Sequence, residues 1–190
     1  MTQAQLQTYI ATFTLTSTGA GDEPGASDIR RKMLAHFVNV GTSEKPEWEL
    51  LGYKQESAAV ASNYDTADVT DVTGESFTDV NSKLEKLEMS EYKINPTRTK
   101  FLAEAIKLKA IDAEEQMQDY QILTVYGFMR NTSGACMAYI EDGCSLILDN
   151  LGGQGYTLSD VSFTLSGRKT FGTVVEIQRT GTTFTEYTAA

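Results

Sequence analysis

One long polar stretch, Tyr53–Val80 (YKQESAAVASNYDTADVTDVTGESFTDV), constrains the fold of this chain more than any other segment. Its apolar side chains are isolated, at Val60, Val69, Val72, Phe77 and Val80. Such a stretch cannot form a core of its own, and a loop of this length inside a compact domain is uncommon. Valine and threonine nevertheless recur at short intervals, as in strands, and Asn63, Asp65 and Gly74 offer turns. We therefore expect an extended hairpin or arm that becomes ordered against another copy of the chain.

The length and composition suit one domain, or one domain with arms. The chain has 190 residues, 41% of them hydrophobic, and a formal net charge of −10 from 26 acidic and 16 basic residues. This charge argues against a general nucleic-acid binder, which needs a basic face, but not against a protein that surrounds DNA without binding it. We see no signal peptide, and no apolar run approaches the roughly 18–20 residues that cross a bilayer. The expected location is the cytoplasm of the cell in which the chain is made.

The two cysteines fit that compartment. Cys136 and Cys144 flank the dipeptide Asp142-Gly143, which is a strong signal for a two-residue hairpin. Such a turn would place Cys136 opposite Asp149 and keep the two thiols apart. We expect two reduced, buried cysteines.

Several short strands separated by turns indicate an antiparallel β-sandwich or barrel. A β-like patch is expected at Tyr9–Thr16, and strands at Arg30–Val40, Ser82–Ile94, Tyr120–Met129, Ala135–Ile140, Cys144–Leu148, Tyr156–Ser166 and Thr173–Arg179. Ser82–Ile94 also has helical spacing after a capping-box pattern at Ser82 and Glu85, but the alternation of Leu87 and Met89 with polar residues favours a strand. Both faces of Tyr120–Met129 are substantially apolar, as in a strand that is covered on both sides. Residues 1–27 form an N-terminal arm that either reaches a neighbour or frays, residues 28–179 form the domain, and residues 180–190 form a tail with the same two options.

One helix, Pro96–Lys109, is expected to flank the sheet. Asn95 can cap it, and Pro96 suits its first position because that amide has no partner within a helix. The apolar face comprises Phe101, Leu102, Ala105 and Ile106, and the basic side comprises Arg98, Lys100, Lys107 and Lys109. The basic side either contacts an acidic neighbour or is solvated.

No motif for catalysis, a cofactor or a metal is evident. The only histidine, His36, lies among apolar residues, which favours a packed or hydrogen-bonded core-edge residue over a metal ligand. The glycines of residues 152–155 lack the Lys-Ser/Thr ending of a phosphate loop. Asp65, Asp68 and Asp71 recur at three-residue intervals, which do not match a calcium loop of the EF-hand type. We expect neither an enzyme nor a bound cofactor.

The same features leave a set of residues for contacts between subunits. Trp48 is expected to anchor either the core or an interface because it would bury a large area. The candidate interface residues are Asp65, Asp68, Asp71, Arg98, Lys100, Lys107, Lys109 and Trp48.

The order of the segments resembles one known family. A strand is followed by WELLGY (Trp48–Tyr53), by the polar stretch ending in DVTGESF (Asp71–Phe77), and by the charged strand LEKLEMSEYKI. The helix, DYQILTVYGF (Asp119–Phe128) and the strand–turn–strand FTLSGRKTFGTV (Phe163–Val174) complete the series. This order, and the SGRKTFGT turn in particular, is similar to the major tail proteins, or tail tube proteins, of long-tailed double-stranded DNA bacteriophages; related tubes occur in contractile tails and in bacterial secretion machines.

The resemblance implies a β-sandwich protomer with a flanking helix, assembled into hexameric rings that stack into a hollow tube. Hairpins from six copies would line the barrel through which the genome passes into the host, without specific DNA binding. Tape measure, terminator and distal tail proteins would be further partners, and the protein would reside in the virion tail. The aspartates of the arm would face either the basic strip of a neighbouring ring or the channel. From the residues alone, two other functions remain: a β-sandwich receptor- or carbohydrate-binding module, and a hydrolase that uses two carboxylates.

Overall fold

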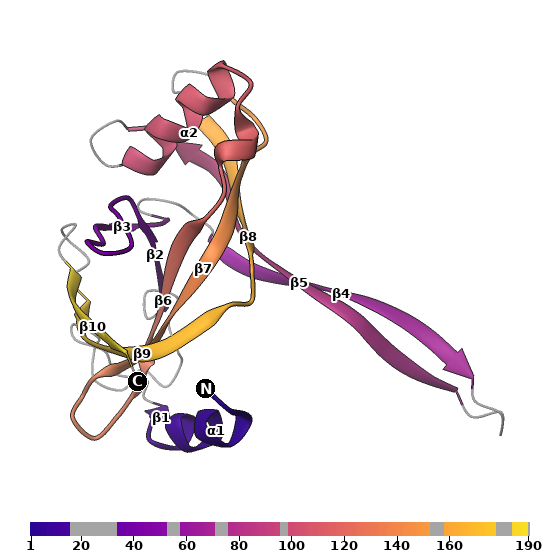
Figure 1. Ribbon diagram of the computed structural model, residues 1–190, viewed down its shortest axis with the longest axis vertical. Helices are drawn as coiled ribbons and strands as arrows, with labels where there is room; N and C mark the ends of the chain where they lie inside the picture. The colour runs from indigo at the N-terminus through magenta and orange to yellow at the C-terminus, as the bar shows by residue number, and fades with distance from the viewer. Residues whose placement is uncertain are drawn as a thin grey trace.

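The computed structural model describes residues 1–15, 34–52, 58–70, 76–95, 99–152, 158–177 and 184–189. The helices are α1 (Gln3–Ala11), α2 (Lys100–Ala110) and the short 3-10 helix η2 (Glu114–Gln116). The strands are β1 (Thr14–Leu15), β2 (Leu34–Asn39), β3 (Trp48–Leu50), β4 (Ala59–Thr70), β5 (Ser76–Lys93), β6 (Tyr120–Arg130), β7 (Cys136–Leu148), β8 (Leu158–Leu165), β9 (Lys169–Ile177) and β10 (Phe184–Ala189). All described strand pairs are antiparallel, and α2 lies at one end of the body (Figure 1). The expected mainly β, antiparallel fold with a flanking helix is confirmed.

The sheet has the order β3-β2-β6-β7-β8-β5-β4, and β9 joins it beside β7. Strand β6 is buried on both faces, as its sequence predicts. Ile122 packs into a core with Phe163 and Leu102 beneath α2, whereas Leu123 packs into a second core with Trp48. The first core contains the three residues of α2 that are fully buried, Phe101, Leu102 and Ala105. Ile106 packs against the same core, so the predicted apolar face of the helix is confirmed.

The predicted hairpin at Asp142-Gly143 is wrong. Strand β7 runs through it without reversing, and pairs with β9 before the glycine (Cys136↔Val174) and with β8 after it (Leu148↔Val161). Gly143 has a φ of 70°, a left-handed conformation that glycine adopts without steric penalty. It bends the strand instead of ending it.

The SGRKTFGT segment does not reverse the chain either. Because β8 and β9 are both antiparallel to β7, they run in one direction and form a single bent path. The bend falls at Gly167, which has a φ of 78° and lies across from the bend at Gly143. The Asp142 amide donates to the Arg168 carbonyl at 3.2 Å, and this bond joins the two bends. Strand β9 therefore begins at Lys169, before the predicted Thr173.

The two thiols are nevertheless free and buried, as expected. Burial raises the pKa of the Cys144 thiol to about 12 and also raises the pKa of Cys136. The register that we expected, with Cys136 opposite Asp149, is wrong because it assumed the hairpin: Cys136 pairs with Arg130 of β6 and Val174 of β9.

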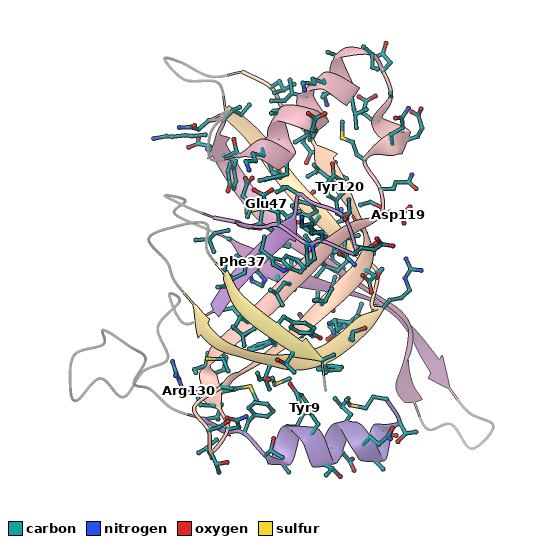
Figure 2. All side chains as sticks on the ribbon, turned by 60° about the vertical axis from the view of Figure 1, so that its left-hand side comes forward. Tyr9, Phe37, Glu47, Asp119, Tyr120 and Arg130 are labelled. Atoms are coloured by element: carbon teal, nitrogen blue, oxygen red, sulfur yellow. The ribbon has the colours of Figure 1, made fainter. Side chains whose placement is uncertain are left out.

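In the N-terminal patch Tyr9–Thr16 the described β structure is limited to β1, Thr14–Leu15, because helix α1 extends to Ala11. A reciprocal capping box explains this: the Thr2 hydroxyl accepts from the Gln5 amide, and the Gln5 side chain accepts from the Thr2 amide. Helix α1 has no buried residue and is attached to the body through Tyr9, which points toward the sheet (Figure 2). The Tyr9 hydroxyl donates to the Gly172 carbonyl at 2.5 Å, and its ring packs against Phe171.

Of the helix expected at Pro96–Lys109, the structure describes α2, which begins at Lys100. Residues 96–98 lie outside the described residues. The cap predicted at Asn95 concerns residues 96–98 and stays a prediction; Thr99, which precedes α2, makes no side-chain cap, and its amide and hydroxyl both donate to the Asn95 carbonyl. Neither α1 nor α2, nor the described 3-10 turn, is long and apolar enough to cross a membrane.

The C-terminal tail, for which we expected fraying or a contact with a neighbour, pairs within its own protomer. Its strand β10 lies antiparallel to β9, from Phe184↔Ile177 to Ala189↔Gly172. Gly172 permits this contact, since a Cβ atom there would lie 2.4 Å from the Thr188 carbonyl oxygen.

Candidate functional site

The most prominent surface feature is a two-stranded hairpin that projects from the body (Figure 1). It consists of β4 and residues 76–84 of β5, and we call it the arm. The register runs from Asn63↔Leu84 near the body to Thr70↔Ser76 at the far end, with a bulge between Asp65 and Thr66. The hairpin expected within Tyr53–Val80 is present, although residues 53–57 and 71–75 lie outside the described residues.

The edges of the arm have no strand beside them in the described protomer. Strand β4 is the last strand in the sheet order, and β5 pairs with β8 only as far as Glu85↔Leu165. The amide and carbonyl groups along these edges can pair with another chain, and an uncovered edge of this length is unusual in a protein that stays monomeric.

The described side chains of the arm leave apolar surface open to solvent. Tyr64 is 57% exposed and Leu84 is 43% exposed, whereas Leu87, closer to the body on β5, is fully buried. The Lys83 ammonium lies 5.8 Å from the centre of the Tyr64 ring. Apolar groups on both strands of a projecting ribbon are typical of a surface that is covered by a partner.

Of the three aspartates that the sequence singled out, two lie in β4. Asp65 pairs in register with Ser82, and Asp68 with Thr78, which places both on the arm. Asp71 lies outside the described residues. Helix α2 is at another end of the molecule (Figure 1), so the arm and the basic side of the helix are not brought together within one protomer.

Most of the expected basic strip is occupied within the protomer. Lys100 forms an ion pair with Glu47, Lys107 pairs with Glu104 at 2.7 Å, and the Lys109 ammonium donates to the Leu148 carbonyl at 2.5 Å. Arg98 lies outside the described residues. The helix therefore presents less free positive charge than its sequence suggested.

Trp48, the other candidate for an interface, belongs to the protomer core. Its side chain is 7% exposed and packs with Phe37 and Leu123. Of the two options for Trp48, a core anchor is the one that the structure supports. His36 is buried too, and its Nδ1 lies 3.0 Å from the Thr124 hydroxyl, as expected for a hydrogen-bonded core residue.

A charged cluster at the base of the arm was missed by the sequence analysis. The Glu85 carboxylate contacts the Lys83 ammonium at 2.6 Å and the Lys169 ammonium at 2.9 Å. These hydrogen bonds, first from Lys83 and then from Lys169, lower the pKa of Glu85 to about 2. We call Glu85, Lys169 and the nearby Glu141 the root cluster. Its members come from β5, β9 and β7, far apart in the sequence, so no local pattern marks them.

A second missed carboxylate, Glu49 of β3, binds the start of α2. Its side chain is 4% exposed. One of its oxygens accepts from the Lys100 amide at 2.9 Å, and the other is buried with no hydrogen-bond partner among the described residues. Burial raises the pKa of Glu49 to about 7, and the backbone hydrogen bond and the charge of Lys100 only partly oppose this shift. Glu49 thus caps the first turn of α2 from a neighbouring strand.

A polar cleft of about 990 Å³ lies beside α2. Its lining includes Asn39, Lys100, Asp119, Gln121 and Arg168, and Figure 2 shows Asp119 next to Tyr120 at the start of β6. Gln121 links Asn39 to Asp142 through two hydrogen bonds of 2.7 Å. Among the described residues, no group of three His, Cys, Asp or Glu side chains is placed to hold a metal ion.

Comparisons with known proteins give limited information. No protein-family model matches the chain, and no curated protein matches it. Among solved structures, it is similar to the tube-terminating cap of the anti-feeding prophage, at 14% identity and a TM-score of 0.40, over 81% of this chain and 97% of that one. It is also similar to the sheath/tube terminator of an extracellular contractile injection system (PVC), at 13% identity and a TM-score of 0.40, over 77% of this chain and 98% of that one. At TM-scores below 0.5 these likenesses establish neither a shared fold nor a shared function.

Proposed function

We propose that this chain is a structural subunit of a phage-tail-like tube, which self-assembles into stacked hexameric rings and forms a conduit for the genome. The observation that carries the proposal is the arm. Its edges lack a strand beside them, and Tyr64 and Leu84 are exposed on it. An isolated two-stranded hairpin is at best marginally stable in water, so an arm of this kind gains most from pairing with other copies.

The charge of the chain supports a conduit rather than a DNA-binding protein. Residues 65–82 contain four aspartates and one glutamate but no lysine or arginine, within a chain of net charge −10. A pore lined with such residues repels a polyanion and lets it slide through without specific binding. The order of sequence segments that resembles tail tube proteins fits the same role. On this proposal the protein resides in the tail of the virion, and its other partners are tape measure, terminator and distal tail proteins.

The proposal can be tested by electron microscopy of the purified protein across a range of concentrations. We expect rings or tubes from the natural chain. In a variant, residues 64–83 are replaced by Asn-Gly, so that Asn63 and Leu84, which already pair, close a two-residue hairpin. This variant should remain a monomer that unfolds cooperatively in urea, with a circular dichroism spectrum that keeps the β character of the body. Glu115→Gln, which changes an exposed residue of η2 outside the candidate interface, is the control and should still assemble.

Two results would contradict the proposal. One is a natural chain that stays monomeric at every concentration; the other is assembly by the variant without an arm. If the excision instead unfolds the protein, the arm belongs to the folded core and is not an assembly element.

A further inference from the structure

The number of strands that pair with β5 changes at Glu85, where its pairing with β8 ends. From Glu85 to Glu88, β5 pairs with β4 on one side and with β8 on the other, and its last pair with β8 is Glu85↔Leu165. Beyond Glu85, the described part of β5 pairs with β4 alone. A two-stranded ribbon bends and twists more easily than a wider sheet, so its direction depends on what holds it at this point.

Glu85 is held by groups of two kinds. The Lys83 ammonium and the Ser62 hydroxyl, which lies 3.3 Å from a carboxylate oxygen, belong to the same hairpin and move with it. Lys169, 2.9 Å from the other carboxylate oxygen, belongs to β9 and therefore to the body. Among the described contacts of the Glu85 carboxylate, Lys169 alone connects the hairpin to β9.

Lys169 is itself held in place by two residues of β7. Its ammonium lies 4.8 Å from the centre of the Tyr139 ring and 3.9 Å from an oxygen of Glu141. Glu141 is fully buried, and its other oxygen accepts from the Gly167 amide at 2.5 Å, in the bend between β8 and β9. An ammonium between two carboxylates and an aromatic face has few alternative positions.

We propose that Lys169 is a positioning residue that fixes the angle between the arm and the body. The contacts run from Glu85 on the arm to Lys169, from Lys169 to Glu141, and from Glu141 to the bend at Gly167. The stretch from Asn63 to Thr70 is about 25 Å long at the usual rise of a strand, so a rotation of about 10° at its base moves the far end by about 4 Å. A displacement of that size is comparable to the spacing between paired strands, so the root cluster determines whether the arm can meet another strand in register. This inference concerns the protomer and holds whether or not the chain forms tubes.

The angle can be measured in the unassembled protein by double electron–electron resonance. Nitroxide labels are attached to cysteines introduced at Thr78 of the arm and at the exposed Thr132 of the β6–β7 turn. The natural Cys136 and Cys144 are buried, and the chain without the introduced cysteines serves as the labelling blank. The width of the distance distribution then reports how freely the arm moves.

Lys169→Met keeps the length of the side chain and removes its charge, and we expect the distribution to become at least twofold wider. Glu85→Gln should have the same effect. Lys169→Arg keeps the charge and should retain the natural width. Lys83→Met is the matched control: it removes the other cation from Glu85, but one that belongs to the arm, and it should leave the width unchanged.

The inference is overturned if Lys169→Met or Glu85→Gln leaves the width unchanged. It is also overturned if Lys83→Met broadens the distribution as much as Lys169→Met does, because the cluster would then stiffen the hairpin without orienting it. If circular dichroism shows that Lys169→Met does not fold, the result for Glu85→Gln decides.

Discussion

Glu49 makes the stability of the protein depend on pH in a direction that is unusual for a carboxylate. Its pKa is about 7 in the folded protein, against 4.5 for an unperturbed glutamate. A raised pKa in the folded state means that folding favours the protonated form, so the stabilisation is complete below pH 4.5 and is lost as the pH rises through 7. A difference of about 2.5 pKa units corresponds to about 3 kcal/mol, at about 1.4 kcal/mol per unit.

We therefore expect Glu49→Gln to change how the free energy of unfolding depends on pH. The glutamine oxygen can still accept from the Lys100 amide. Its NH2 group would occupy the position of the unpartnered glutamate oxygen, and this burial changes the stability by a constant amount at every pH. The difference in unfolding free energy, variant minus natural chain, should increase by up to about 3 kcal/mol between pH 4.5 and 8, and should level off above pH 7.

Urea unfolding of dilute protein at half-unit steps from pH 4.5 to 8.5 measures this difference. Thr132→Ala, which changes an exposed side chain without a titratable group, is the control and should give a flat difference. A flat difference for Glu49→Gln would refute the reasoning, because a carboxylate with an ordinary pKa contributes no slope in this range.

Three further predictions concern other parts of the fold. Cys136 and Cys144 should not react with a thiol reagent in the native protein, and both should react in denaturant, because they are free and buried. Gly172→Ala should destabilise the protein by about 1–3 kcal/mol in urea unfolding, because a methyl group would collide with the Thr188 carbonyl, whereas Gly152→Ala has open space and should be neutral. Tyr9→Phe removes the hydrogen bond to the Gly172 carbonyl and should accelerate amide hydrogen exchange in α1 by about five-fold, equivalent to about 1 kcal/mol; unchanged exchange would show that this bond does not hold the helix.

The spacing of apolar residues correctly predicted the elements whose buried positions repeat regularly along the chain. Tyr120–Met129 became a strand buried on both faces, and Phe101, Leu102 and Ala105 became the buried face of α2. The β-like patch at Tyr9–Thr16 was only partly right for an equally local reason: the helix that the capping box of Thr2 and Gln5 starts extends to Ala11, which leaves Thr14–Leu15 as the strand.

The errors in the second half of the chain have a tertiary cause. A glycine in the left-handed conformation suits both a hairpin turn and a bend within a strand. At Gly143 the chain bends, because β7 pairs with β9 before the glycine and with β8 after it. The same limit applies to the candidate site. The polar composition of Tyr53–Val80 was sufficient to predict an arm, but Lys169 and Glu141 meet Glu85 only because three strands converge. Glu49 was missed as a cap of α2 for the same reason: it lies on a strand that no local pattern connects to the helix.

The single bent path of β8 and β9 also has a mechanical consequence. The arm continues the line of β5, so tension along it would stretch the hydrogen bonds between Glu85–Lys93 and Leu158–Leu165 in parallel, in shear, rather than open them one after another. Because β8 continues into β9 through a bend of three residues, this force would pass directly to the far half of the sheet, where β9 pairs with β7 and β10. A pull on the arm would therefore be shared by most of the protomer before any one pair of strands separates.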